Sequence, residues 1–377
     1  MKKVVHVISL LRGLGGVQQA FLSYYKYAQK HSELKHYIFS THKKSKKYDG
    51  LKNFFIIKKN FFSFLLHLYS KNSIIYFHNK LSSKQVLYLL KFMPSNNLIF
   101  HEHGEAWNIK TQQQKKIYQT NAKLAKTIIV NSIATKHMLV KKFQISEDKL
   151  KLAYYGFRDP KIKKTTINKK NIQVGLIARL ELVKGTHLLI EAANLLKDKN
   201  INFLIGGDGH LENELKKLSE GNDKIKFVGN VLNPINFMKN LDILVVPSIR
   251  EPLGIVNIEA GLCKIPVVGS NIDGIPEVVT NNYSGILINP TKKINLKKEY
   301  HRQPPLPNLV INPNTYKLIK PKQLDPKILL NAILFLCNNK KLRLEYGQNL
   351  YQHVIKKFSI ESYFKTLEEI YQNLEKD

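Results

Sequence analysis

The sequence predicts an α/β protein made of two doubly wound parallel-sheet domains. Its 377 residues favour two domains over one, because a domain usually holds ~150 residues. Short, β-branched apolar runs alternate with longer helical patterns along the chain, which is typical of βαβ units. One polar stretch without periodicity interrupts this alternation near the middle of the chain. The 43% hydrophobic content can fill two cores.

Ten apolar runs have the composition of buried parallel strands. The expected strands are 4–8, 74–77, 98–100, 127–130, 172–177, 203–205, 225–228, 243–246, 266–268 and 286–288. Helical patterns fall between them, for example at 187–196 and 211–219. A last helix, at about 360–374, carries apolar residues at helical spacing.

These elements divide the chain into an N-terminal Rossmann-like domain, residues 1–160, and a C-terminal domain, residues 172–358. The polar segment 161–171 is the expected linker. An irregular, proline-bearing insertion runs from about 290 to 326. Residues 359–377 contain the C-terminal helix.

The net charge of +32 is concentrated in the N-terminal half of the chain. Residues 1–165 carry 31 basic and 7 acidic side chains, a net charge of +24. Such a field attracts phosphates, acidic lipids or nucleic acid. The alternative is a lysine-rich composition whose solvated faces default to Lys, but that does not explain the asymmetry between the two halves.

The cysteine count and the hydropathy pattern favour a cytoplasmic protein. Cys263 and Cys337 are too few for a disulfide scaffold and fit a reducing compartment. No apolar run reaches the ~18 residues of a membrane span, so any membrane contact is expected to be peripheral. The aromatic segment 61–69, flanked by Lys58, Lys59 and Lys71, could enter an anionic surface. Its alternative is a buried helix of the N-terminal domain.

Ligands of doubly wound folds bind outside the carboxyl ends of the strands, so the motifs of interest should follow strands. Gly13, Gly15 and Gly16 follow the first strand and precede a helix, where amide groups can hold an anion. The alternative is a tight turn. No acid follows in the region 37–43, which disfavours a dinucleotide site.

A second polar motif, His101-Glu102-His103-Gly104-Glu105, ends the strand at 98–100. Strand alternation places His101 and His103 on one face and Glu102 on the other. A metal site, a structural histidine and a substrate-facing polar site are all conceivable here. No remote cluster evidently completes a metal shell, which favours the substrate-facing interpretation.

Two further motifs follow strands of the C-terminal domain. Arg179 and Lys184 lie five residues apart across a strand–helix turn, where both cations could reach one phosphate; the alternative is a solvated turn. Glu251 stands at an expected helix entrance opened near Pro252, and Glu259 lies inside that helix. A buried carboxylate is costly unless it accepts hydrogen bonds, for which polyol hydroxyls are suited. The alternative is a dipole-complementing acid and a paired internal Glu.

Together these motifs resemble the retaining nucleotide-sugar glycosyltransferases of the GT-B fold, specifically family 4, or group 1. The resemblance covers most of the chain and is best over residues 172–290. Glu251 and Glu259 match the family's E-x7-E pattern, and Arg179 and Lys184 match its basic pair. Gly15 and Gly16 match the glycine-rich first loop, and His103 matches the histidine of the N-terminal domain.

The resemblance implies a role for each matching position. Arg179 and Lys184 would neutralise the donor diphosphate, helped by amides near Gly15-Gly16 and Leu253-Gly254. Glu251 would contact the donor sugar, and Glu259 the ribose hydroxyls. Main chain near Val228 would contact the base, and His103 the transferred sugar or the acceptor. The terminal helix would cross back onto the N-terminal domain, and the two domains would face a central cleft.

The implied activity is transfer of a sugar, with retention, from a nucleotide-diphosphate sugar such as a UDP-sugar to a glycan or glycolipid of the cell envelope. The sequence holds no Asp-x-Asp, so neither a metal nor another cofactor is expected. The protein would act in the cytoplasm, on the inner face of the plasma membrane. Alternatives are a nucleotide-sugar epimerase or phosphorylase of the same fold, or a non-enzymatic polyanion-binding protein. Six arginines and no recognisable module argue against nucleic acid as a partner.

Overall fold

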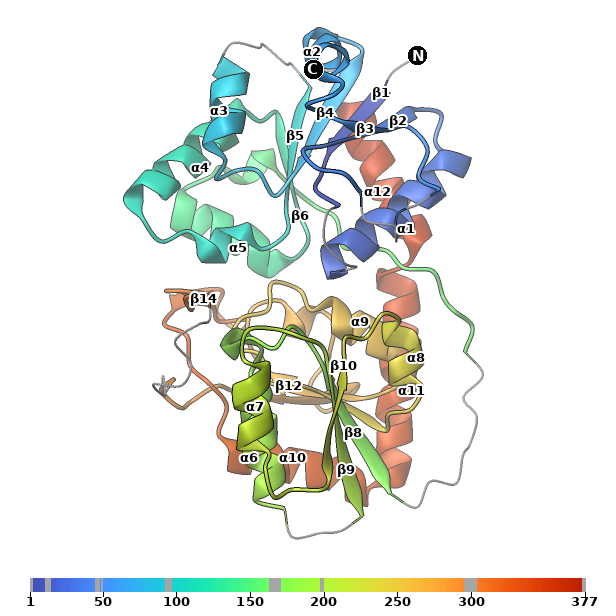
Figure 1. Ribbon diagram of the computed structural model, residues 1–377, viewed down its shortest axis with the longest axis vertical. Coiled ribbons are helices and arrows are strands. Elements are labelled where there is room, and N and C mark those ends of the chain that lie inside the picture. The colour runs from blue at the N-terminus through green and yellow to red at the C-terminus, as the bar shows by residue number, and fades with distance from the viewer. Residues whose placement is uncertain are drawn as a thin grey trace. The chain divides into compact units, whose positions relative to one another are not determined.

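The computed structural model describes residues 3–10, 15–44, 48, 50–91, 97–162, 171–196, 200–294 and 304–374. It divides the chain into two compact units (Figure 1). Unit 1 consists of Met1–Arg158 together with Phe358–Asp377, and unit 2 of Asp159–Lys357. Residues 163–170 of the expected linker and 295–303 of the expected insertion lie outside the described residues.

Unit 1 is built on a parallel sheet of seven described strands, ordered β3-β2-β1-β4-β5-β6-β7. The strands are β1 (Lys3–Val7), β2 (Lys35–Ser40), β3 (Phe54–Ile56), β4 (Ser73–His78), β5 (Leu98–Glu102), β6 (Thr127–Val130) and β7 (Leu150–Leu152). Its helices are α1 (Gly16–His31), α2 (Phe61–Tyr69), α3 (Lys84–Lys91), α4 (Gln112–Leu124), α5 (Ile133–Phe143) and α12 (Ile360–Asn373). The order reverses between β1 and β4, which is the topology of a doubly wound fold.

Unit 2 has a parallel sheet of six described strands, ordered β10-β9-β8-β11-β12-β13. The strands are β8 (Ile172–Ile177), β9 (Ile201–Gly206), β10 (Ile225–Gly229), β11 (Ile243–Val246), β12 (Val267–Ser270) and β13 (Gly285–Ile288). Its helices are α6 (Thr186–Asn194), α7 (Glu212–Leu218), α8 (Pro234–Met238), α9 (Ile255–Leu262), α10 (Pro326–Asn338) and α11 (Lys340–Lys357). The predicted fold class of two doubly wound parallel sheets is confirmed, and each predicted strand overlaps an observed one.

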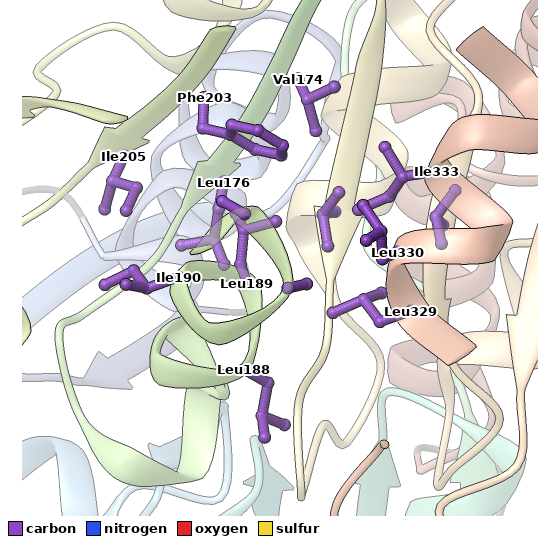
Figure 2. Close-up of a cluster of buried hydrophobic side chains, with 14 of the residues drawn as sticks. Val174, Leu176, Leu188, Leu189, Ile190, Phe203, Ile205, Leu329, Leu330 and Ile333 are labelled. Atoms are coloured by element: carbon purple, nitrogen blue, oxygen red, sulfur yellow. The ribbon is translucent and has the colours of Figure 1, made fainter. Parts of the chain in front are cut away.

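The core of unit 2 holds the β-sheet against helices α6 and α10 (Figure 2). Val174 and Leu176 of β8 and Phe203 of β9 are fully buried, as are Leu189 of α6 and Ile333 of α10. Burying such a side chain stabilises the fold by about 1.5–3 kcal/mol. This packing fixes the carboxyl ends of β8 and β9, from which the loops of the candidate site begin.

Helix α12 packs against α1 within unit 1. The hydroxyl groups of Tyr24 and Tyr371 lie 3.1 Å apart, and Ser32 Oγ donates to Glu368 Oε1 at 3.0 Å. Ser359 caps the helix by accepting from the Ser362 amide. The last described turn therefore belongs to the N-terminal unit, although unit 2 precedes it in the sequence.

Candidate functional site

Three loops of unit 2 interlock at the carboxyl ends of β8, β9 and β11. The Leu180 amide donates to Asp208 O at 2.7 Å, which ties the β8 loop to the β9 loop. The Ile249 amide donates to Val183 O at 2.8 Å, which ties the β11 loop to the β8 loop. Gly185 has φ +73°, and a Cβ there would lie 2.0 Å from Pro247 O. Only glycine allows this approach without strain.

The interlocked loops bring Lys184 and Glu251 into direct contact. Lys184 Nζ lies 2.7 Å from Glu251 Oε2, and the two side chains are only 18% and 11% exposed. Ser248 Oγ approaches the same carboxylate oxygen at 3.4 Å. The sequence predicted both residues for the site, but in separate roles. The structure shows them as one ion pair, so an anion that bound Lys184 would compete with Glu251.

Arg179 lies in the same neighbourhood but is more exposed. Its Nη1 pairs with Glu181 Oε1 at 2.7 Å, and 64% of its side chain is exposed. Glu181 is buried, with only 9% of its side chain exposed, and a buried carboxylate is costly to leave unpaired. An anion that bound Arg179 would therefore compete with Glu181.

Arg250 and Asp273 are two charged residues of this site that the sequence analysis did not select. Burial lowers the pKa of the Arg250 guanidinium, and the charges of Glu251, Asp273, Arg179 and Glu181 all act on it. Asp273 accepts hydrogen bonds from the amides of Glu251, at 3.0 Å, and Ile311, at 2.7 Å. The available signal for Arg250 was its position beside Glu251. Asp273 carried none, because its role depends on a tertiary contact.

The predicted helix start near Pro252 is wrong by one turn. Helix α9 begins at Ile255 because Gly254, its N-cap, adopts φ +83°. Glu251 therefore lies in the loop, where Gly274 N donates to its carbonyl at 3.1 Å. The loop that precedes α9, rather than the helix dipole, therefore positions the Glu251 carboxylate.

Helix α9 buries two polar side chains. Glu259 is 7% exposed, and burial raises the pKa of its carboxyl group to about 8. Neither amide atom of Asn257 has a hydrogen-bond partner among the described residues, although both atoms are buried. Such groups are costly when left unsatisfied. Val228, predicted near the base, lies on β10 with 47% of its surface exposed.

His103, a predicted site residue of unit 1, lies just beyond β5 among other histidines and Tyr155. His103 Nδ1 lies 2.5 Å from Tyr155 Oη, and its Nε2 lies 3.0 Å from His78 Nδ1. Glu102 turns to the other face, as predicted, where it accepts from the amides of Gly104 and Ala106. Burial raises the pKa of Glu102 to about 7. The sequence analysis missed His78, which pairs in register with His101 on the neighbouring strand.

The glycine-rich loop is described only from Gly15 onward. Gly15 is the N-cap of α1, and Gly16 begins the helix. The first turn of α1 contains no acidic residue. The amides of this helix start are thus compatible with the predicted anion contact, which stays a prediction.

The predicted site residues are divided between the two units. Unit 2 contains Arg179, Lys184, Val228, Leu253, Gly254, Glu251 and Glu259, and unit 1 contains Gly15, Gly16 and His103. Among the described residues, no helix has the length and apolar character needed to cross a bilayer.

Known proteins share both the fold and part of the sequence. Anabaena Alr3699/HepE, solved in complex with UDP-glucose, superposes with a TM-score of 0.77 over 99% of this chain and 100% of its own, at 17% identity. The capsular polysaccharide biosynthesis glycosyltransferase CapM of Staphylococcus aureus is 24% identical over 276 residues, 71% of this chain and 61% of CapM.

A shorter match links the chain to a Campylobacter jejuni enzyme, N,N'-diacetylbacillosaminyl-diphospho-undecaprenol alpha-1,3-N-acetylgalactosaminyltransferase. That protein is 32% identical over 126 residues, 33% of each chain. The chain thus spans less than two thirds of the length of these two curated relatives.

The two parallel-sheet units have the GT-B fold that the sequence predicted. Residues 157–303 match the family model described as glycosyl transferases group 1. The matched range contains Arg179, Lys184, Glu251 and Glu259.

Proposed function

We propose that this protein is a retaining, metal-independent glycosyltransferase that moves a sugar from a nucleotide-diphosphate sugar, with UDP as the nucleotide. The observation that carries the proposal is the buried Lys184–Glu251 pair, set among Arg179 and Arg250 in a group 1 domain. Two or three fixed cations at the carboxyl end of a parallel sheet suit a diphosphate.

In this proposal, the basic side chains stabilise the departing diphosphate. The bond between the anomeric carbon and the phosphate oxygen breaks, and the acceptor oxygen bonds to that carbon on the same face. The acceptor proton passes to the phosphate oxygen that leaves. Lys184 and Arg179 supply fixed positive charge to that oxygen, a preorganised effect worth several kcal/mol. Glu251, released from Lys184, faces the positive charge that develops on the sugar.

The remaining residues bind and orient the donor. Ionised Glu259 accepts hydrogen bonds from the ribose hydroxyls, and main chain at Val228 contacts the base. The amides near Gly254 and the α1 start at Gly15-Gly16 add donors to the phosphates. His103 lies on the acceptor side in unit 1.

The acceptor is a glycan or lipid-linked glycan of envelope polysaccharide synthesis. Support comes from the names of the relatives: CapM acts in capsular polysaccharide biosynthesis, and the Campylobacter enzyme is named for a diphospho-undecaprenol-linked sugar. HepE, bound to UDP-glucose, supports a UDP-sugar donor.

We expect the purified protein to bind a UDP-sugar and to transfer its sugar at the same rate with and without excess EDTA. Thermal-shift screening with a panel of nucleotide sugars identifies the donor, and product NMR gives the anomeric configuration. Loss of transfer in EDTA would overturn metal independence, and an inverted product would overturn retention. An epimerised donor in the absence of any acceptor would instead identify an epimerase.

Helix α2 supports a further element of this proposal, contact with an anionic membrane surface from the cytoplasmic side. Phe62 is 81% and Leu66 73% exposed, while Phe64 and Leu68 on the opposite face are buried. Lys58, Lys59 and Lys71 flank the helix and are exposed. An amphipathic helix with aromatic and basic residues in this arrangement suits the interface of an anionic bilayer.

We expect the protein to bind vesicles that contain phosphatidylglycerol and to leave them at high salt, because each nearby basic residue contributes about 1 kcal/mol. Sedimentation with vesicles measures the bound fraction. The Phe62→Ser/Leu66→Ser variant should lose binding, while Tyr88→Ser, which removes another exposed aromatic ring of unit 1, should not. Equal binding to neutral and anionic vesicles would contradict the electrostatic part.

A further inference from the structure

Unit 1 contains a continuous row of buried and partly buried hydrogen bonds that runs from Tyr155 through four histidines. His103 Nδ1 lies 2.5 Å from Tyr155 Oη, and its Nε2 lies 3.0 Å from His78 Nδ1. His78 Nε2 lies 3.3 Å from His6 Nδ1, and His6 Nε2 lies 3.0 Å from His36 Nδ1. We call these five residues the histidine relay.

Strand register explains why the relay forms. His6 on β1 pairs with Tyr76 of β4, two residues before His78, and with Ile38 of β2, two residues after His36. Side chains two residues apart on a strand share a face. The relay therefore crosses one face of three adjacent strands, and His103 joins it just beyond the fourth.

The ring geometry shows that two of the three His–His contacts are nearly straight N–H···N hydrogen bonds, whereas the His78 and His6 rings are tilted by 35°. The planes of the His78 and His103 rings are parallel within 1°, and the ring centroids lie 5.3 Å apart. If the two nitrogens point straight at each other, the centroid separation equals the N···N distance plus the radius of each ring. The observed separation is close to that sum. The His6–His36 rings, 5.4 Å apart and tilted by 13°, have the same geometry.

A transition-metal site is the competing interpretation. One ring nitrogen from each of His78, His101 and His103 lies within 4.8 Å of the others. Metal ligands must converge on a common point, whereas the facing nitrogens of His78 and His103 point along one line. The geometry therefore favours a shared proton between these two rings.

Counting protons then gives the direction of the relay. Four neutral imidazoles carry four ring protons, and the three His–His contacts use three of them. If the fourth proton lies on His36 Nε2, each ring donates from its Nε2 to Nδ1 of the next ring, and the Tyr155 hydroxyl donates to His103 Nδ1. Only the His36 Nε2–H is then left without a partner. Among the described residues His36 Nε2 is indeed buried and unpartnered. The opposite direction leaves two groups unsatisfied, the Tyr155 hydroxyl proton and the His36 lone pair.

Other contacts of the relay agree with this direction. Asn131 Nδ2 donates to Tyr155 Oη at 3.0 Å, which leaves the tyrosine proton free to point at His103. Burial lowers the pKa of His78 to about 3 and of His36 to about 4. Burial and neighbouring imidazoles also lower the pKa of His6 and His103. The four rings are therefore neutral at physiological pH.

We propose that His78, His6 and His36 are positioning residues that hold His103 as an Nε2–H donor toward the protein interior, with its Nδ1 lone pair occupied by Tyr155. His103 then has no free lone pair with which to remove a proton from an acceptor. This inference deepens the proposed function. The acceptor proton passes to the departing phosphate, and His103 only orients the transferred sugar or the acceptor. Of the experiments below, only the kcat measurements depend on the proposed function.

Nitrogen-15 NMR of the full-length protein labelled at histidine tests the relay without any substrate. We expect couplings across the three His–His hydrogen bonds and an unprotonated Nδ1 signal for each of the four rings. In His6→Leu, the His103 signals should shift to a mixture of tautomers, although His6 does not touch His103. Absent couplings, or a protonated His103 Nδ1 in the unaltered protein, would overturn the proposal.

Variants separate positioning from packing. His6→Leu should lower kcat about tenfold and leave KM for the donor unchanged, because the proposed donor contacts lie mainly in unit 2. His6→Gln, whose amide offers one donor and one acceptor, should recover most of that loss. Phe77→Leu, a buried change on β4 outside the relay, should lower stability without altering the His103 signals. Equal kcat losses in His6→Gln and His6→Leu would contradict the relay.

A Zn²⁺ titration tests the competing interpretation, a metal site. We expect no stoichiometric binding to the full chain by calorimetry and no change in the histidine spectrum. Tight binding that shifts the signals of His78, His101 and His103 together would overturn the relay in favour of a metal site. Donor affinity and transfer do not enter this measurement, so its outcome is independent of the proposed function.

Discussion

Removing either member of the Lys184–Glu251 pair should reduce kcat by about 10²–10³-fold. In the proposed mechanism, Lys184→Met removes fixed positive charge from the leaving diphosphate, and Glu251→Gln removes the carboxylate that would face the developing charge on the sugar. Both groups are mostly buried, so each single variant also leaves an uncompensated charge, which costs about 3–5 kcal/mol of stability. Steady-state kinetics and denaturant unfolding, measured on the same preparations, give the two effects.

The double variant separates catalysis from folding. Lys184→Met/Glu251→Gln leaves no orphan charge, so it should recover most of the stability while its kcat stays low. The matched control is Lys216→Met/Glu212→Gln, which removes an exposed pair with the same 2.7 Å separation in the same unit and should change kcat less than threefold. Recovery of turnover in the double variant would mean that the pair is only structural.

The sequence predicted the sheets well because their signal is local. Buried parallel strands are short apolar runs, and the runs at 127–130, 172–177 and 243–246 match β6, β8 and β11 residue for residue. Strands β3 and β7 were missed because each has only three residues and little periodicity. The ten expected strands also did not include β2 or the two-residue strands β14 (Val310–Ile311) and β15 (Leu318–Ile319).

The candidate residues could be placed after the correct strands, but their partners could not be predicted. Lys184 and Glu251 meet because Gly185 lets the β8 loop approach Pro247, a contact between segments far apart in the sequence. The late start of α9 follows from the left-handed backbone of Gly254, which a helix-period pattern does not reveal. In the histidine relay, strand alternation predicts which residues share a face. It does not predict the strand order or the ring orientations that connect them.

Glu259 is the residue for which we expect the largest effect of pH. Its carboxyl has a pKa of about 8 in the folded protein because burial disfavours the charged form, against an ordinary value near 4.5 when the chain is unfolded. Between these two values the folded state holds a proton that the unfolded state has lost, so stability falls as pH rises through this window. Above about pH 8 both states are ionised and the loss is complete.

Replacing Glu259 by Gln should remove this pH dependence. Relative to Glu259→Gln, the unaltered protein should lose on the order of 4 kcal/mol of unfolding free energy between pH 5 and pH 8. Urea unfolding at half-unit pH intervals measures the difference. Glu191→Gln, the same change in helix α6 of the same unit, is the control and should leave the pH profile unchanged.

The same carboxyl group should make UDP binding depend on pH. If ribose hydroxyls bind ionised Glu259, the nucleotide must expel the proton, so UDP affinity should rise with pH up to about 8 and binding should release up to one proton. Calorimetry in buffers of different ionisation enthalpy counts that proton. Glu259→Gln should bind UDP more weakly and without proton release. Undiminished affinity in this variant would show that the burial of Glu259 is structural and that the ribose lies elsewhere, whereas the stability profile would still test the buried carboxyl itself.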